Sequence, residues 1–343
     1  MAQRVRFKRH IRFLEAEGKV RSLSTINEGV DLPGGEPFAR MIDAITPMPP
    51  KEHFIAVLSR AMGVTQDMAK LLSARLFETG LIEYFDDERK EHSRFDRQLH
   101  LFDVLSPVKD HQENIERQDR LNRAQVLVLG LGGVGHQVAL SLAASGVGSL
   151  VLVDDDVVEE SNLHRQVLFT HADVRRPKVD AAREGLLRIA PACHVQVCRA
   201  MVGSQEQWRS IIATFPGTRY VMISADRPVQ LVSWISTARA EFHYHAIKCG
   251  YMGVQGIIGP MVGPDTSGYD ELFESWGPLV DAQTSAVKRI NEMAVAPTMA
   301  ASNAIMANIA ALELIKHITG VGGLRLMGCR LLLDLRDYST CFG

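Results

Sequence analysis

The sequence predicts an α/β protein, in which a Rossmann-like domain follows a small winged-helix-like α+β module. Three observations lead to this fold class. An apolar run at residues 126–129, typical of a buried strand, is followed by a glycine-rich turn and a helical stretch at about 134–145. A second apolar run at 149–153 ends in an acidic residue. Residues 1–92 lack this pattern and contain short strand-like and helix-like segments.

The glycine-rich turn, G-L-G-G-V-G, predicts a phosphate-binding loop. Glycine lets the backbone turn tightly and approach a phosphate, and the following helix offers free N–H groups to the same anion. Asp154, roughly 20 residues further on, stands where a ligand of the ribose hydroxyls is expected. On its own this pattern indicates only a nucleotide, and NAD or FAD is as good an interpretation as any other nucleotide. The glycines are Gly130, Gly132, Gly133 and Gly135.

Cationic residues after Asp154 favour ATP over a redox cofactor. Segment 161–166 has the sequence S-N-L-H-R-Q, and segment 175–178 has the sequence R-R-P-K. Hydride transfer has no need of several cations near the phosphates. Cleavage of ATP between its α and β phosphates does need them, because negative charge builds up there in the transition state.

These motifs resemble the ThiF/MoeB family, which has the fold of ubiquitin-activating enzymes. The similarity runs from about residue 94 to about residue 334, and the S-N-L-x-R-Q element is highly specific. The resemblance implies that MgATP adenylates a carboxylate and that pyrophosphate is released. It implies that Asp154 holds the ribose and that Asp156 also belongs to the ATP site. The residues that it implies for the phosphates are Asn162, Arg165, Gln166 and Lys178.

Two further positions fit the same resemblance. Asp226 ends a predicted strand at 221–226, where the family has a magnesium-binding aspartate, and Mg²⁺ takes one or two carboxylates besides phosphate oxygens. Segment 94–98, R-F-D-R-Q, is similar to a family segment whose second arginine reaches the ATP of the partner subunit. Arg97 would therefore act in trans within a homodimer. The alternatives are a strand-end turn residue for Asp226 and a surface charge for Arg97. The expected catalytic residues are Arg97, Arg165, Lys178 and Asp226.

Composition and cysteine usage indicate a cytoplasmic protein. The chain has 343 residues, 46% of them apolar and 23% charged, and a formal net charge of −2. This balance argues against general binding to nucleic acid or to a membrane surface, and we expect neither a membrane-spanning helix nor a signal peptide. The five cysteines have no C-x-x-C spacing, which predicts a reducing compartment.

The cysteines also depart from a pattern that is common in the family. Many ThiF/MoeB relatives bind zinc through two C-x-x-C pairs. Tyr269 and Leu272 stand at the place of the first pair, and only Cys341 remains near the end. Because one thiolate cannot form a four-ligand site, we expect no structural zinc.

Residues 1–92 are predicted to form a separate module, joined by the charged run 86–91 to an adenylation domain at 93–343. Segments 5–13 and 20–24, with a turn at Glu17 and Gly18, are typical of a β-hairpin. Helices are expected at 37–45, at 50–62 and, after the N-cap Thr65, up to residue 77. A strand is expected at 81–85.

The net charge of residues 1–92 helps to distinguish between DNA and a peptide as the binding partner of this module. Residues 1–92 contain 14 Lys and Arg and 14 Asp and Glu, so their net charge of zero disfavours the DNA binding that a winged helix suggests. An exposed hairpin edge can instead accept an extended peptide by strand addition. A cap or dimerisation domain is the remaining alternative.

The C-terminal part predicts further α/β elements. A helix is expected at 231–240, strands between 247 and 262, a long helix at 299–318 that ends before Gly320, and a strand at 331–335. Segment 265–296 has no clear periodicity and is expected to form a mobile loop over the site.

Within the family, the chain most resembles the branch that makes peptide antibiotics. The N-terminal module, the R-Q-V-L-F run at 165–169 and the S-A-D-R-P run at 224–228 carry this resemblance. It implies that the leader of a ribosomally made precursor peptide docks on residues 1–92. It also implies that ATP activates glutamate side chains, which then cyclise as in pantocin-like biosynthesis. Positioning and electrostatics carry such a reaction, so no covalent cysteine is required.

Two alternatives stay open. One is adenylation of the C-terminus of a sulfur-carrier or ubiquitin-like protein, which predicts binding of a protein that ends in Gly-Gly. The other is a catalytically silent scaffold that presents a peptide, which predicts no ATP turnover.

Overall fold

The computed structural model describes residues 3–23, 29–86, 94–106, 111–273, 284–292 and 296–343. The chain forms two compact units, Met1–Gln118 and Asp119–Gly343. The division therefore lies after the predicted boundary at residue 92, within the helix His111–Arg123. The predicted boundary stays a prediction. Most of the predicted linker at 86–91 lies outside the described residues.

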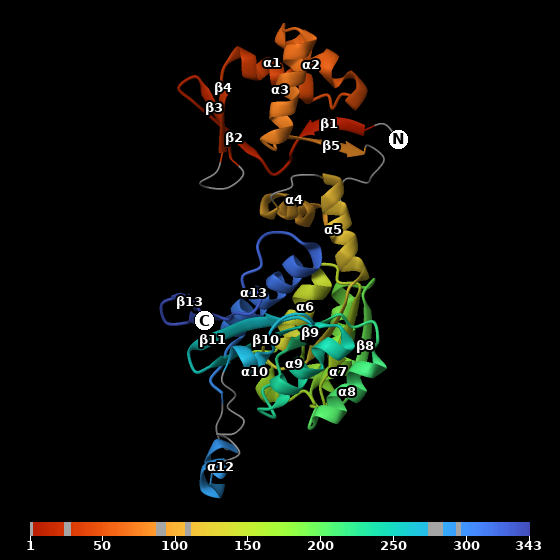
Figure 1. Ribbon diagram of the computed structural model, residues 1–343, viewed down its shortest axis with the longest axis vertical. Coiled ribbons are helices and arrows are strands. Elements are labelled where there is room, and N and C mark those ends of the chain that lie inside the picture. Colours follow the sequence, from red (N-terminus) through yellow and green to blue (C-terminus); the bar gives the residue numbers. More distant parts are fainter. Residues whose placement is uncertain (1–2, 24–28, 87–93, 107–110, 274–283, 293–295) are drawn as a thin grey trace. The chain divides into compact units, whose positions relative to one another are not determined.

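The first unit combines helices with two small antiparallel sheets (Figure 1). One sheet pairs β1 with β5, and the other has the order β2-β3-β4. The helices enclose an apolar core that includes Val5, Phe54, Leu58 and Leu76. The elements are β1 (Gln3–Phe7), β2 (Arg12–Ala16), β3 (Lys19–Leu23), β4 (Gly29–Pro33), α1 (Glu36–Ile45), α2 (Phe54–Met62), α3 (Gln66–Glu78), β5 (Ile82–Asp86), α4 (Asp96–Leu105) and the start of α5 (His111–Arg123).

The predicted hairpin is confirmed at its turn but not over its whole first strand. Glu17 and Gly18 both have positive φ and connect β2 to β3. Residues 5–7 do not belong to this hairpin: they form β1 and pair with β5, and β4 was not predicted. The reason is tertiary, because Val5 is fully buried in the core of the helices. The predicted N-cap is confirmed, since the Thr65 hydroxyl accepts the N–H of Met68 at 3.3 Å.

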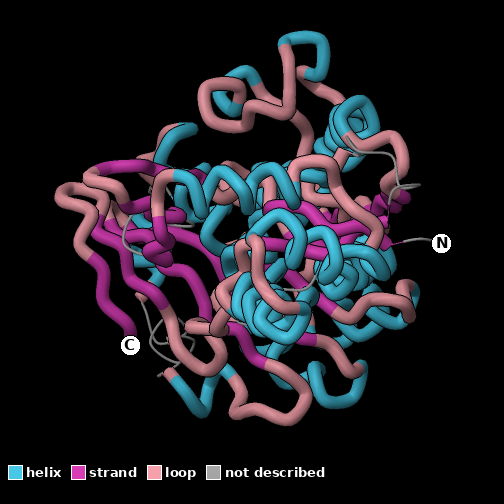
Figure 2. The backbone as a smooth tube through the Cα atoms, turned by 90° about the horizontal axis from the view of Figure 1, so that it is seen from above, coloured by secondary structure: helices cyan, strands magenta, loops and turns pink. Residues whose placement is uncertain are grey.

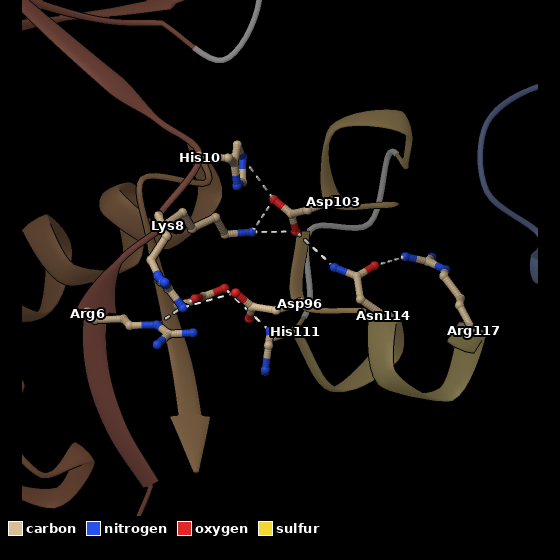
Figure 3. A network of polar contacts seen from close by, with 10 residues as sticks. Arg6, Lys8, His10, Asp96, Asp103, His111, Asn114 and Arg117 are labelled. Carbon is tan, nitrogen blue, oxygen red and sulfur yellow. Dashed lines mark hydrogen bonds and ion pairs between the residues drawn. The ribbon is translucent and has the colours of Figure 1, made fainter. Parts of the chain in front are cut away.

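A buried network of charged side chains connects β1 to α4 and α5 in this unit (Figure 3). Lys8, just after β1, donates to both carboxylate oxygens of Asp103 on α4, at 2.6 and 2.7 Å. Asn114 on α5 donates to Asp103 at 3.3 Å, and Arg6 pairs with Glu83 of β5 at 2.8 Å. These contacts account for the inclusion of α4 and the start of α5 in the first unit.

The second unit is built on a mixed sheet with the order β13-β12-β11-β10-β9-β6-β7-β8 in the described part of the chain. Strands β8, β7, β6, β9 and β10 are parallel, which confirms the predicted α/β class. The antiparallel edge lies beside the C-terminus (Figure 2). The strands are β6 (Gln125–Leu129), β7 (Ser149–Val153), β8 (His194–Cys198), β9 (Tyr220–Ile223), β10 (His245–Met252), β11 (Gln255–Val262), β12 (Leu331–Asp334) and β13 (Thr340–Phe342).

Helices cover both faces of this sheet. Successive residues of β6 and β7 point to opposite faces, and the residues on both faces are buried. One face packs on α8 and α9 through a core that contains Trp208 and Ile235. Helix α6 contacts both α7 and α13, and all three helices contact the sheet. Their bounds are α6 (Gly135–Ala144), α7 (Lys178–Ile189), α8 (Gln205–Thr214), α9 (Leu231–Phe242) and α13 (Ala300–Thr319).

Several predictions for this unit are confirmed. The strand at 149–153 agrees to the residue, and the long helix ends at Gly320, whose φ of 73° suits a glycine. Segment 265–296 contains the short helices α10 (Tyr269–Leu272) and α12 (Ser285–Glu292), and its remaining central part lies outside the described residues. No helix among the described residues is long and apolar enough to cross a membrane.

Candidate functional site

The predicted nucleotide site lies where the order of the sheet reverses. Strand β6 lies between β7 and β9, and in open α/β sheets ligands bind outside the carboxyl ends of the strands at such a reversal. Gly130 follows β6 with φ 87°, and a Cβ there would lie 2.7 Å from the backbone N of Ala225. Ser224, after β9, donates its hydroxyl to the Gly130 carbonyl at 2.7 Å. The two strand ends therefore touch, and only glycine fits between them.

Asp154 holds the glycine-rich loop in place. One of its carboxylate oxygens accepts the N–H of Leu131 at 2.6 Å, and the other accepts the N–H of Asp156 at 2.8 Å. Burial raises the pKa of Asp154, and the hydrogen bond from Leu131 and the nearby Lys178 act in the opposite direction. The loop is thus fixed by the residue that was predicted to hold the ribose, and the ribose contact itself stays a prediction.

Lys178 is a buried cation with an exposed partner. It is the first residue of α7 and is only 5% exposed. Its ammonium lies 2.8 Å from a carboxylate oxygen of Asp156, whose side chain is 66% exposed. Both residues were predicted for the ATP site, and the structure brings them together. An incoming phosphate could replace Asp156 as the partner of the ammonium.

The S-N-L-x-R-Q element folds on itself through its own side chains. Asn162 accepts the N–H of Glu159 at 3.2 Å, and Arg165 donates to the carbonyl of Ser161 at 2.6 Å. Gln166 is 1% exposed, and its Oε1 has no hydrogen-bond partner among the described residues. The amide oxygen of Asn162 is therefore used by the local turn, whereas Gln166 keeps a buried acceptor.

His136 joins this element to the glycine-rich loop and was missed by the sequence analysis. Its Nδ1 lies 2.8 Å from the Gly132 carbonyl, and its Nε2 accepts the N–H of Val167 at 3.1 Å. Burial lowers its pKa to about 4, so the ring is neutral and its proton is on Nδ1. No motif marks this role in the sequence, because a histidine in the first turn of a helix is common.

Lys248 is the second missed residue. It lies on β10, and its ammonium donates to the carbonyl of Ala225 at 2.7 Å. Burial lowers its pKa, and the carboxylate of Asp226 acts in the opposite direction. Asp226 itself is exposed. An exposed carboxylate in this position suits a magnesium ion that takes its other ligands from phosphate and water.

Arg97 belongs to the first unit, where it is exposed in the first turn of α4. The other predicted residues of the site all belong to the second unit. The action of Arg97 in trans stays a prediction.

Sequence comparison finds adenylyltransferases. The sulfur carrier protein ThiS adenylyltransferase of Escherichia coli (strain K12) is 42% identical over 102 residues, which are 30% of this chain and 37% of that protein. A probable molybdopterin-synthase adenylyltransferase of Gracilaria tenuistipitata var. liui is 29% identical over 252 residues, 73% of this chain and 63% of that protein. The matched region therefore spans less than two thirds of these curated relatives.

Solved structures resemble the chain over nearly its whole length. Escherichia coli MccB with ATP matches 99% of this chain and 96% of that one, with a TM-score of 0.78 and 21% identity. The microcin C7 biosynthetic enzyme MccB with N-formylated MccA has the same coverage and identity and a TM-score of 0.80. PaaA matches 98% of each chain, with a TM-score of 0.75 and 24% identity. The sequence motifs favour these two proteins, the pantocin A enzyme PaaA first and MccB second, and the structures show the shared fold.

Residues 95–339 match the ThiF family. This stretch contains the glycine-rich loop, the S-N-L-x-R-Q element, Lys178 and Asp226. The resemblance predicted from these motifs is confirmed, and the chain belongs to the ThiF family.

Proposed function

We propose that this protein uses ATP to adenylate glutamate side chains of a ribosomally made precursor peptide, which then cyclises during the biosynthesis of a pantocin-like peptide antibiotic. One observation carries the proposal. The family match begins at residue 95, whereas the structural match to MccB and PaaA also takes in the first unit. The N-terminal unit is thus a feature shared with two proteins of the peptide-antibiotic branch, one of them solved with its peptide MccA.

The chemistry divides into two displacements. A carboxylate oxygen attacks the α-phosphorus of ATP, and pyrophosphate leaves. A nitrogen of the peptide then attacks the acyl carbon, AMP leaves with the bonding electrons, and the nitrogen releases its proton to solvent. Lys178, Arg165 and Arg97 from a second subunit are the proposed cations that offset charge at the phosphates, and Asp226 is the proposed ligand of Mg²⁺, which would supply further positive charge there.

No thiol is assigned a role in this reaction. Burial raises the pKa of Cys249 to about 12 and also raises that of Cys198. Thiolate is the nucleophilic form of cysteine, so these two side chains are poorly suited to carry an acyl group.

The proposed docking site for the leader is an edge of the β2-β3-β4 sheet. Strands β2 and β4 each have one neighbour in this sheet among the described residues, so each leaves backbone groups to which an extended peptide can pair. Arg12 on β2 and Lys19 and Arg21 on β3 are exposed, which favours a leader with acidic side chains.

The test uses the full-length enzyme, ATP and the peptide encoded by a short reading frame next to this gene. We expect pyrophosphate release and a product lighter by one water for each bond formed, and we expect much slower turnover of the same peptide without its leader. Absence of pyrophosphate release with this peptide, while a carrier protein is adenylated, would contradict the proposal.

The names of the sequence relatives favour a second candidate, adenylation of the C-terminus of a sulfur-carrier or ubiquitin-like protein. Escherichia coli ThiS, whose adenylyltransferase is 42% identical to part of this chain, is the probe. Pyrophosphate release with ThiS, and none with the peptide, would support this candidate over the first.

A further inference from the structure

We propose that the side-chain amide of Asn303, near the N-terminus of α13, is a further contact for the phosphates of the bound nucleotide. The inference rests on the proposed ATP-dependent function. It adds to the phosphate site a residue that lies far along the chain from the glycine-rich loop and from the S-N-L-x-R-Q element.

The first observation is a buried donor without a partner. Asn303 is 1% exposed, and its Nδ2 makes no hydrogen bond with any described residue. Its Oδ1 accepts the hydroxyl of Thr298 at 2.9 Å, so the NH₂ group is the unused end of the amide. Buried polar groups are almost always satisfied in native proteins, so an unused buried donor indicates a missing acceptor.

The second observation is where the donor lies. A Cβ built on Gly133 would come within 2.1 Å of Nδ2, so the amide lies directly against the third glycine of the G-x-G-G-x-G loop. A Cβ built on Gly132 would meet nothing within 4 Å, which leaves open space beside the same loop. The proposed phosphate lies along this loop, between the open space at Gly132 and the amide of Asn303 at Gly133.

The third observation concerns charge. Asn303 is the fourth residue of α13, a helix of 20 residues, so it lies at the positive end of the helix dipole. Such a position favours an acceptor that carries negative charge. A phosphate oxygen of ATP meets this requirement, and so does a carboxylate of the peptide substrate. The loop is a phosphate loop by its glycine pattern, and for this reason we assign the contact to the nucleotide.

Asn303→Asp tests the assignment, because it keeps the shape and replaces the donor with an anion. We expect the Kd for ATP, measured without any peptide, to rise by about 10- to 100-fold, and the Kd for adenosine to change by less than about twofold. Asn308→Asp is the matched control on the same helix. Asn308 is exposed, and its Oδ1 accepts the hydroxyl of Ser141 at 2.6 Å, a bond that aspartate also makes. Both Kd values should therefore stay within about twofold of wild type in the control.

The outcomes separate the two proposals. If wild type binds no ATP, the proposed function fails and this inference fails with it. If wild type binds ATP and Asn303→Asp binds it equally well, the inference alone is overturned. A loss of peptide binding with unchanged ATP binding overturns it too, because the amide then serves the carboxylate of the substrate.

A crystal structure of the wild-type enzyme with a non-hydrolysable ATP analogue gives a test that needs no variant. A phosphate oxygen within about 3.2 Å of Nδ2 supports the proposal. An amide that stays beyond hydrogen-bond reach of every phosphate overturns it.

Discussion

Two ion pairs of similar length have different surroundings. Lys8 and Asp103 in the first unit lie 2.6 Å apart, and their side chains are 0% and 3% exposed. Lys178 and Asp156 in the second unit lie 2.8 Å apart, but the side chain of Asp156 is 66% exposed. The first pair cannot separate without leaving a buried charge, whereas the second can exchange Asp156 for another anion while Asp156 returns to water. The first arrangement stabilises a fold, and the second leaves a cation available to a ligand.

Buried polar atoms without a hydrogen-bond partner among the described residues occur in both units. Asp103 also accepts a hydrogen bond from Asn114, so the network of the first unit satisfies its central carboxylate (Figure 3). In the second unit Gln166 and Asn303 each have a buried polar atom without a partner among the described residues. His10, His100 and Arg117 of the first unit also have such atoms, so Gln166 and Asn303 are distinguished by their place at the candidate site, where a nucleotide could supply the missing partners.

The largest effect on stability is expected from the buried pair. Asp103→Ala should lower the free energy of unfolding of the first unit by about 3–5 kcal/mol, because it leaves the Lys8 ammonium buried opposite no carboxylate. Urea unfolding of the full chain measures it. Glu78→Ala is the control, since its pair with Arg75 is exposed on both sides, and it should cost less than about 1 kcal/mol. Equal losses in the two variants would contradict the structural role of the network.

The exposed site should respond in activity rather than in stability. Asp226→Asn, Lys178→Ala and Arg165→Ala are each expected to lower the rate of pyrophosphate release by about 10²–10³, the effect of losing one preorganised charge. Asp226→Asn should unfold at the wild-type urea concentration, because Asp226 is exposed. Arg188→Ala, an exposed cation in the last turn of the same helix as Lys178, is the control and should keep full activity. Pyrophosphate release at a near wild-type rate by Asp226→Asn would contradict the role of Asp226 in the site.

His136 gives the second unit a sensitivity to acid. Its pKa is about 4 in the folded protein against 6.5 in the unfolded chain, so the unfolded state binds more protons between these values. Its contribution is complete above about pH 6.5 and is lost as the pH falls towards 4, by about 3 kcal/mol at most. Urea unfolding between pH 7 and about pH 4 should show a weaker pH dependence in His136→Asn than in wild type. If the free energy of unfolding depends on pH equally in both proteins, His136 is not the cause of this pH dependence. His245, with a folded pKa also about 4, calls for His245→Asn as the parallel variant.

The candidate site could be predicted from sequence as far as its contacts are local. The strand, glycine-rich loop, helix and second strand from 125 to 154 follow one another directly, so periodicity and glycine spacing were enough. His136, Lys248 and Asn303 were missed because they contact segments far away in the chain, at Val167, Ala225 and Gly133. Only folding brings such segments together, and no motif records the approach.

The first unit shows the same limit in its strands. The turn at Glu17 and Gly18 was predicted because two residues with positive φ leave a local signature. The pairing of β1 with β5 joins segments that are far apart in the chain and leaves no local signature, so residues 5–7 were assigned to the wrong partner. Charged residues that are buried by such pairings, Arg6 and Lys8 among them, look like surface residues in the sequence.

The smallest expected signal comes from mixed dimers, which test whether Arg97 of one subunit serves the site of the other. Arg97→Ala and Asp226→Asn should each be inactive alone. If Arg97 serves the site of a second subunit, a mixed dimer contains one site that has both Asp226 and a partner's arginine. Random exchange makes half of the dimers mixed, each with one complete site of two, so an equimolar mixture should recover about a quarter of wild-type pyrophosphate release. Two affinity tags, purified in sequence, confirm that mixed dimers are present. Mixed dimers without activity would show that Arg97 acts within its own subunit. Full activity of Arg97→Ala on its own would instead show that Arg97 is an ordinary surface charge, as its exposure on α4 allows.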